Sequence, residues 1–406
     1  MLNIILLGIT SLLTDISSEM VYPILPIYLV TRLGVSPAIL GLIEGVAESL
    51  ASLLKVFSGF FSDKTGQRRP FAILGYASST IGKFLLYISN SWLYVFAGRA
   101  VDRIGKGIRT APRDALIAES SQESKRGSAF GLHRAMDTLG ATIGVLWAYF
   151  LIVHYSGNTG SLQELNRWAG RDEFKNIFLF SLIPASLGVA VLFLVREKRK
   201  TVDVLRRQLK FRWSSLDRRL KLFLIFSFIF TLGNSSNQFL LLRAQNLGAA
   251  LPKIILFYLF YNIIHAAVSY PAARLSDRLG RKKVLVSGYV FYALVYLGFA
   301  LTKSVNNLWF LFGLYGLYSG FTEGVEKALV VDIAPANLRG TAIGLHATLV
   351  GAGLLPASLL AGILWKFWGA QAAFGFGSIM GMLASVGLWF ILAPQPPELG
   401  GINHSS

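Results

Sequence analysis

Two similar stretches decide the fold of this chain: GFFSDKTGQRR at residues 59–69 and ARLSDRLGRKK at residues 273–283. Each follows an apolar segment, and each carries an aspartate three residues before a glycine that basic residues soon follow. The aspartates are Asp63 and Asp277, which lie 214 residues apart. A glycine at this place can adopt positive φ, so the pattern predicts a tight turn after a helix.

A second repeat occurs farther along the chain. RGSAFGLH at residues 126–133 matches RGTAIGLH at residues 339–346, and the two final histidines lie 213 residues apart. One short match would carry little weight, but two matches in nearly the same register indicate an internal duplication.

The composition places the chain in a lipid bilayer. Apolar residues make up 53% of the sequence, charged residues only 15%, and mean hydropathy is +0.54, whereas a soluble chain is about 25% charged. A helix needs roughly 20 mostly apolar residues to cross the hydrocarbon. The predicted fold class is therefore all-α, a polytopic membrane protein, whose about twelve spans are 4–29, 38–62, 71–90, 92–118, 127–153, 176–195, 221–242, 253–276, 284–302, 308–333, 340–364 and 370–393.

The basic residues predict the orientation. Lysine and arginine gather in short segments after alternate spans, which the positive-inside rule places in the cytoplasm. The same pattern argues against nucleic-acid binding despite a net charge of +18, because no broad basic face results. We expect a multi-pass protein of the inner (cytoplasmic) membrane with both termini in the cytoplasm. The expected parts are an N-terminal six-helix bundle (1–195), a basic cytoplasmic linker (196–220), a C-terminal six-helix bundle (221–393) and a cytoplasmic tail (394–406).

The first repeated motif resembles the cytoplasmic loop signature of the major facilitator superfamily, Gly-x-x-x-Asp-(Arg/Lys)-x-Gly-(Arg/Lys)-(Arg/Lys). Two positions depart from it, because Gln67 replaces a basic residue and Ala273 replaces the first glycine. The resemblance implies two pseudo-symmetric six-helix halves around a substrate site, and a loop contact that acts as a gate. The gating residues that it implies are Gly59, Asp63, Gly66, Arg68, Arg69, Asp277, Arg278, Gly280, Arg281 and Lys282.

The fourth span, residues 92–118, also resembles a charged subgroup of bacterial drug-efflux-like permeases, through GKGIRTAPRD at residues 105–114. Its Arg103 stands in an Arg-x-x-x-Gly pattern that is similar to one linked to proton coupling in the family, although Arg99 competes for that role. The subgroup implies no particular substrate.

Ionisable residues inside spans are costly in lipid and are normally retained for function or for buried pairing. Asp15 and Glu19 are four residues apart in the first span, and therefore share one helix face. Two carboxylates in a medium of low dielectric compete for ionisation, which makes the pair a candidate proton acceptor. The predicted proton-coupling residues are Asp15, Glu19, Asp102, Arg103 and Glu323.

Other polar side chains at mid-span depth suit a substrate cavity, since amides and a phenol can orient a ligand at little desolvation cost. The predicted cavity residues are Lys106, Arg109, Asp137, Asn234, Asn237, Gln238, Tyr261, Asn262, His265 and Glu326. Arg113 and Glu326 occupy equivalent repeat positions with opposite charge, which suggests an ion pair between the halves. His133 and His346 are expected to pack against loops rather than to bind a metal.

These features predict a secondary transporter that moves a small organic solute by alternating access. Proton-coupled export of an amphipathic or cationic compound is the first expectation. The alternative is proton-coupled uptake of an anionic metabolite or a metal chelate such as a siderophore, with Arg103, Lys106 and Arg109 as anion clamps.

Other classes of protein fit the sequence less well. His-Glu-x-x-His, Gly-x-Ser-x-Gly and Walker motifs are absent from the sequence, which argues against an enzyme or an ATP-driven pump. A channel would have no need of duplicated gating motifs. With no cysteine, the chain forms no disulfide. We expect a monomer that uses a proton gradient and no cofactor.

Overall fold

The computed structural model describes residues 2–122, 126–156, 171–197, 216–335 and 339–391. Every regular element in these residues is a helix, which confirms the predicted all-α fold class. The helices of the first half are α1 (Leu2–Val21), α2 (Leu25–Thr31), α3 (Pro37–Thr65), α4 (Arg69–Tyr87), α5 (Trp92–Ser120), α6 (Arg126–Ser156) and α8 (Arg171–Leu192). Those of the second half are α9 (Arg218–Gly233), α10 (Gln238–Asn246), α11 (Leu251–Leu279), α12 (Arg281–Leu301), α13 (Asn307–Ile333), α14 (Arg339–Trp368) and α15 (Ala370–Ile391).

Two spans that the sequence predicted as continuous are broken. The span over 4–29 divides into α1 and α2 at Pro23, because a proline cannot continue the hydrogen-bond ladder of a helix. The span over 221–242 divides into α9 and α10 at residues 234–237, where asparagine and serine compete with the backbone for hydrogen bonds. The two repeats are offset by 213 or 214 residues, so Pro23 corresponds to position 236 or 237. The two breaks therefore fall at equivalent positions of the two halves.

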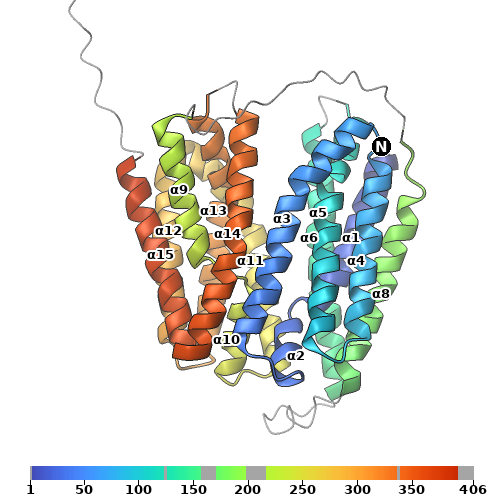
Figure 1. The fold of residues 1–406 in the computed structure, drawn as a ribbon, viewed down its shortest axis with the longest axis horizontal. Coiled ribbons are helices and arrows are strands. Elements are labelled where there is room, and N and C mark those ends of the chain that lie inside the picture. Colours follow the sequence, from blue (N-terminus) through green and yellow to red (C-terminus); the bar gives the residue numbers. More distant parts are fainter. Residues whose placement is uncertain (1, 123–125, 157–170, 198–215, 336–338, 392–406) are drawn as a thin grey trace, which may run out of the picture.

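Figure 1 shows two helical bundles side by side, the first built from α1 to α8 and the second from α9 to α15. Equivalent pairs of helices pack together in both bundles. In the first, α1 packs on α6 and α8, α3 on α5, and α4 on α5 and α8. In the second, α9 packs on α14 and α15, α11 on α13, and α12 on α13 and α15. Between the bundles, α3 packs on α14 and α6 packs on α11. This matched packing is the structural counterpart of the duplicated sequence. Most of the predicted linker and the whole predicted tail lie outside the described residues, so the domain boundaries stay a prediction.

The two ends of the molecule differ. At one end α1 begins and α15 ends (Figure 1); we call it the linker end, because α8 ends and α9 begins there. We call the opposite end, where α2 and α10 lie, the far end. Glycines bring α3 and α14 close together toward the far end, since a Cβ on Gly41 or Gly362 would overlap the backbone of the other helix. The two helices diverge toward the linker end (Figure 1).

Both glycines of the repeated loop motif adopt positive φ, as the sequence predicted. Gly66 has φ 64° and follows α3, and Gly280 has φ 91° and follows α11. Only glycine takes this conformation without strain from a Cβ. The chain therefore turns at the same place in both halves.

Seven of the described helical segments are long and apolar enough to cross a membrane by length and composition alone. The charged helix α5 is not among them, and its charged side chains Arg99, Asp102, Arg103 and Arg109 are buried inside the protein instead. Burial against other helices is how a membrane protein keeps such groups away from lipid.

Candidate functional site

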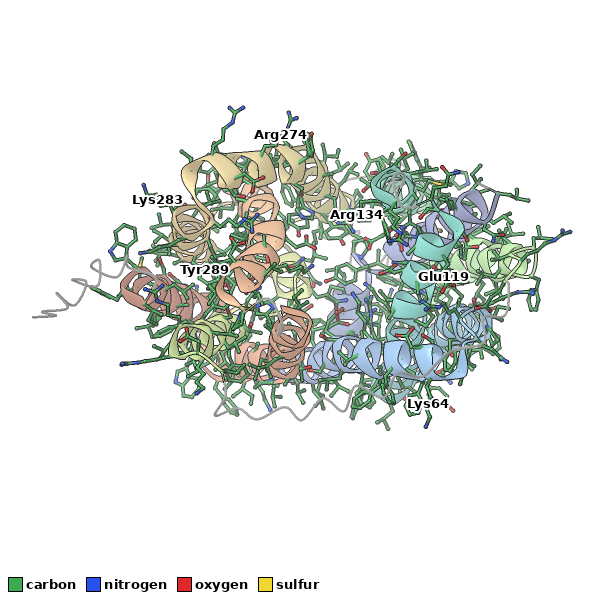
Figure 2. The ribbon with its side chains drawn as sticks, turned by 90° about the horizontal axis from the view of Figure 1, so that it is seen from above. Lys64, Glu119, Arg134, Arg274, Lys283 and Tyr289 are labelled. Atoms are coloured by element: carbon green, nitrogen blue, oxygen red, sulfur yellow. The ribbon has the colours of Figure 1, made fainter. Side chains whose placement is uncertain are left out.

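A cavity of about 450 Å³ lies between the two bundles. Its first wall comes from α1, α3 and α5, and its second wall from α9, α11, α13, α14 and the break between α9 and α10. Figure 2 looks down on the linker end, where side chains from both bundles point into the space between them and Arg134 lies at its border. Lys64 and Lys283 lie on the outer rim in the same view.

The far end of this cavity is closed by contacts between the bundles. The Tyr258 hydroxyl donates to a Glu19 carboxylate oxygen at 2.8 Å, and the rings of Tyr22 and Tyr258 lie 5.4 Å apart. The hydroxyl of Ser236 lies 3.5 Å from a carboxylate oxygen of Glu44. The cavity is not enclosed, and with these contacts closing its far end, its open side lies toward the linker end, where α3 and α14 diverge (Figure 1).

Most of the predicted site residues line this one cavity. They come from stretches of sequence more than 300 residues apart, and the packing of the two bundles brings them together. They are Asp15, Glu19, Asp102, Arg103, Lys106, Arg109, Asn234, Asn237, Tyr261, His265, Glu323 and Glu326.

Three predicted cavity residues lie elsewhere. The Asp137 carboxylate faces the His133 imidazole at 3.5 Å within α6. Gln238 begins α10 and is fully buried, and neither atom of its amide has a hydrogen-bond partner among the described residues. Asn262 follows Tyr261 on α11, and a step of one residue turns a helical side chain by about 100° away from the cavity. Mid-span depth alone did not distinguish the faces of these helices.

A buried ion-pair network backs the first wall. Arg99 donates two hydrogen bonds of 2.7 Å to the two oxygens of Glu44, whose side chain is 0% exposed. Arg103 Nη1 lies 3.4 Å from Glu48 and its Nε lies 3.5 Å from Asp102. A bidentate arginine–carboxylate pair fixes both side chains in direction as well as in charge.

Asp102 connects this network to α4. One of its oxygens lies 3.6 Å from Arg99, and the other lies 3.7 Å from the ammonium nitrogen of Lys83, which is only 2% exposed. Neither Lys83 Nζ nor Asp102 Oδ1 has a hydrogen-bond partner among the described residues. Asp102 is therefore shared among three cations.

The other residues of the first wall differ in how many contacts they make with neighbouring side chains. Arg109 donates to the hydroxyl of Ser79 and stacks over the ring of Tyr76 at 4.5 Å. Asp15 makes no hydrogen bond or ion pair with any described residue, although Lys106, Arg109 and Asp137 lie close enough to interact with it electrostatically. Asp15 is thus a cavity carboxylate with no direct partner in the described chain.

The second wall is rich in tyrosine. The Tyr315 hydroxyl donates to Asn237 at 2.7 Å, and Asn237 donates to the Tyr261 hydroxyl at 3.4 Å. The Tyr261 ring stacks on His265 with their centroids 6.0 Å apart and at an interplanar angle of 4°. This network holds the break between α9 and α10 against α11 and α13.

Two carboxylates complete the second wall. An oxygen of Glu323 lies 3.1 Å from His265 Nε2, and Arg134 of the first bundle interacts with it electrostatically. An oxygen of Glu326 accepts a 3.1 Å hydrogen bond from the Tyr289 hydroxyl and lies 3.0 Å from His346 Nε2. The ring of His346 also packs on Phe223, so this histidine lies against helices and not against loops as the sequence predicted. His133 faces Asp137 one turn along its own helix, α6.

The predicted ion pair between Arg113 and Glu326 is not formed within the described residues. Arg113 is paired with its neighbour Asp114 at 2.8 Å and also donates to Ser11. Glu326 faces His346 in its own bundle, so the oppositely charged side chains at the two equivalent repeat positions do not contact each other in this state.

The predicted gating residues make contacts inside each bundle. In the first, Arg68 lies 3.0 Å from Asp63 and 3.2 Å from Glu119. In the second, Arg281 lies 3.3 Å from Asp277 and 2.7 Å from Asp332. No ion pair among the described residues joins these loops across the bundles, which agrees with a cavity open at the linker end.

The remaining gating residues differ in their surroundings. Arg69 donates to the carbonyl of Phe193 at 2.8 Å, and the ammonium of Lys282 lies over the ring of Trp389. Gly59 lies in α3, where a Cβ would come within 3.3 Å of Ala111. Arg278 is exposed in the last turn of α11.

Sequence reasoning missed several lining residues. They are chiefly aromatic side chains, together with one carboxylate, Glu48; the aromatic ones are Tyr22, Phe230, Tyr258, Tyr315 and Tyr318. The spacing of Tyr258, Tyr261 and His265, and that of Tyr315, Tyr318 and Thr322, follows one face of a helix. This spacing in the sequence is enough to predict that these tyrosines share the helix faces that form the second wall.

The chain resembles known transporters over nearly its whole length. A sequence profile of the Major Facilitator Superfamily matches residues 7–242 and 222–404. The uncharacterized MFS-type transporter MJ1317 of Methanocaldococcus jannaschii is 40% identical over 397 residues, which cover 96% of this chain and 94% of that one. The multidrug resistance protein MdtH of Edwardsiella ictaluri is 22% identical over 83% of this chain and 80% of its own. Among solved structures, the nucleoside transporter NupG superposes with a TM-score of 0.77 at 13% identity, covering 97% of this chain and 100% of that one.

Proposed function

Since this chain belongs to the major facilitator superfamily, a family of secondary transporters and not of enzymes, we propose that it exports an amphipathic or cationic organic compound in exchange for protons. The chain is a multi-pass membrane protein. In this proposal its linker end faces the cytoplasm, and the described state is the one that loads substrate from there.

The charge of the cavity carries the proposal. Six carboxylates line it against three cationic side chains in the described residues. The carboxylates are Asp15, Glu19, Glu48, Asp102, Glu323 and Glu326, and the cations are Arg103, Lys106 and Arg109. With Glu44, Lys83 and Arg99 of the buried network the count is seven to five, so the cavity as a whole still attracts positive charge. A volume of about 450 Å³ is in the range that holds a drug-sized molecule.

The alternative of anion uptake is less well supported. It needs arginines that are free to grip an anion, yet Arg103 already faces Glu48 and Asp102, and Arg109 is held by Ser79 and Tyr76. Of the three proposed clamps, only the side chain of Lys106 makes no ion pair, hydrogen bond or ring contact with the described residues. The distant relatives named multidrug resistance protein MdtH also favour export of an organic compound.

Asp15 and Glu19 are the proposed proton carriers. Asp15 can take up and release a proton through the open end without first breaking an ion pair. Glu19 lies on the same face of α1 and receives the hydrogen bond from Tyr258 that helps to close the far end. A change in its protonation therefore acts directly on a contact between the bundles, which is what coupling to alternating access requires.

Transport by the purified full chain in proteoliposomes tests this function. With an imposed pH gradient, we expect movement of ethidium, a cationic amphipathic probe, and none of the anionic probe carboxyfluorescein. Asp15→Asn and Glu19→Gln should abolish the dependence on the pH gradient. Asp217→Asn is the matched control, because it makes the same chemical change outside the cavity and keeps a good N-cap residue for α9.

Three results would contradict the proposal. Equal gradient-driven transport in all variants would remove the two carboxylates from coupling. Movement of carboxyfluorescein without ethidium would favour the anion alternative. Transport that follows an imposed Na⁺ gradient and ignores pH would replace the proton as the coupling ion.

A further inference from the structure

The two walls of the cavity differ in charge. Arg103, Lys106 and Arg109 all belong to the first wall. Among the described residues of the second wall there is no lysine or arginine, and Glu323 and Glu326 supply two carboxylates. The first wall also carries four carboxylates, so its charges largely offset one another, whereas the second wall presents only negative charge. A cationic group inside the cavity is therefore attracted to the second wall without meeting a lysine or arginine there.

The two carboxylates of the second wall are not equivalent. The Glu323 side chain is 53% exposed, and its oxygens face His265 at 3.1 Å and Lys327 at 4.0 Å. The Glu326 side chain is only 19% exposed, and no described lysine or arginine pairs with it. Glu326 is thus the better shielded of the two and the less compensated by permanent cations.

Glu326 is also held in a fixed direction. The Tyr289 hydroxyl and the His346 imidazole both contact the same oxygen, Oε1, at 3.1 Å and 3.0 Å. The other oxygen, Oε2, has no partner among the described residues. Because Glu326 lines the cavity, this second oxygen is available to a ligand there.

Packed aromatic rings lead from this carboxylate along the cavity wall. Tyr289 stacks on Phe230 with centroids 3.7 Å apart, and Phe230 lies 6.2 Å from the ring of Tyr318. Phe230 and Tyr318 both line the cavity. Aromatic faces attract organic cations and also contact their apolar substituents.

We propose that the Glu326 carboxylate, oriented by Tyr289 and His346, is the docking point for the positive group of an organic cation, with Phe230 and Tyr318 against its apolar substituents. This inference rests on the proposed transport of cationic compounds and adds a division of labour to it. The second wall binds the charge of the substrate, while Asp15 and Glu19 on the first wall carry the proton.

Binding of two nearly isosteric ions of opposite charge tests the inference. Tetraphenylphosphonium and tetraphenylborate are titrated into the purified full chain in detergent at one pH. The wild type should prefer the phosphonium. Glu326→Gln, whose amide oxygen still accepts from Tyr289, should weaken phosphonium binding by roughly tenfold, a loss of about 1.4 kcal/mol. It should not weaken borate binding, because it removes a charge that repels the anion.

Further variants control for folding. Glu326→Asp keeps the charge but withdraws it by one methylene, so it should give an intermediate loss; it serves as the test if Glu326→Gln does not fold. Glu326→Lys should reverse the preference in favour of tetraphenylborate. Asp217→Asn should bind both ions as the wild type does.

The failure of this inference differs from a failure of the proposed function. If the wild type binds tetraphenylphosphonium and Glu326→Gln binds it equally well, the docking point is wrong and the cationic substrate class stands. If the wild type shows no preference for tetraphenylphosphonium, the substrate class fails and the docking point with it.

Discussion

The hydroxyl of Tyr258 in α11 donates a 2.8 Å hydrogen bond to the carboxylate of Glu19 in α1, 239 residues away in the sequence. The bond joins the two bundles on the far side of the cavity, and one of its partners is a proposed proton carrier. It must break when the far end opens. In the proposed function, the contact links the protonation of Glu19 to the choice between the two states of the transporter.

Tyr258→Phe should favour the state that is open at the far end. It removes this bond without emptying the space of the ring, at a cost to the closed far end of about 1–3 kcal/mol. Since the chain has no cysteine, Ser18→Cys places a unique thiol in the cavity wall. Labelling by an impermeant maleimide added at the far side should become faster in the Tyr258→Phe background; unchanged labelling would mean that the bond does not hold the far end closed.

Removing one partner of the Arg99–Glu44 pair should be strongly destabilising. Both side chains are almost fully buried, so Glu44→Leu leaves a buried arginine without its bidentate partner, at a cost of about 3–5 kcal/mol. The double variant Glu44→Leu with Arg99→Leu should melt at a higher temperature than Glu44→Leu alone, as followed by fluorescence in detergent. A double variant that melts no higher than Glu44→Leu would show that the unpaired Arg99 is not the cause of the destabilisation.

Glu197 should stabilise the start of α4. Its two carboxylate oxygens accept from the backbone N–H groups of Arg68 and Arg69 at 2.6 Å and 3.0 Å. A carboxylate at a helix N-terminus satisfies free donors and the positive end of the helix dipole. Glu197→Ala should therefore cost roughly 1 kcal/mol and speed amide hydrogen exchange at residues 68–72.

The exchange experiment has an internal reference in α12. The equivalent turn of the second half, at Gly280, does not depend on Glu197, so exchange at residues 281–285 should not change. Faster exchange in both helices would indicate a general loosening rather than the loss of a cap.

Gly66→Ala should destabilise the chain by about 1–2 kcal/mol, because its φ of 64° is strained for a residue with a Cβ. Gly131→Ala is the matched control. Gly131 lies within α6 with negative φ, and a Cβ there meets no atom within 4 Å, so alanine should be neutral or stabilising by up to about 1 kcal/mol. Equal melting temperatures of the two variants would contradict the assignment of strain to Gly66.

Much of the fold could be predicted from local patterns. The apolar segments located the helices to within a few residues, and the repeated Asp-x-x-Gly pattern located both positive-φ turns. The prediction missed the breaks near Pro23 and at residues 234–237, because hydropathy averaged over a long window does not register a local interruption. It also placed Gln238 and Asn262 in the cavity, because depth along a span says nothing about the direction in which a side chain points.

The sequence alone determined that this chain is a duplicated, multi-spanning membrane protein of a transporter family. Spanning a bilayer requires long apolar segments, and duplication leaves repeated motifs, and both can be read from the order of residues. Only the tertiary structure decided which charges meet. Glu19 pairs with Tyr258, Glu326 with His346 and not Arg113, and Glu197 with the turn before α4. These pairings depend on how each helix is rotated about its axis and packed against its neighbours. The distance between two such residues in the sequence does not determine whether their side chains meet.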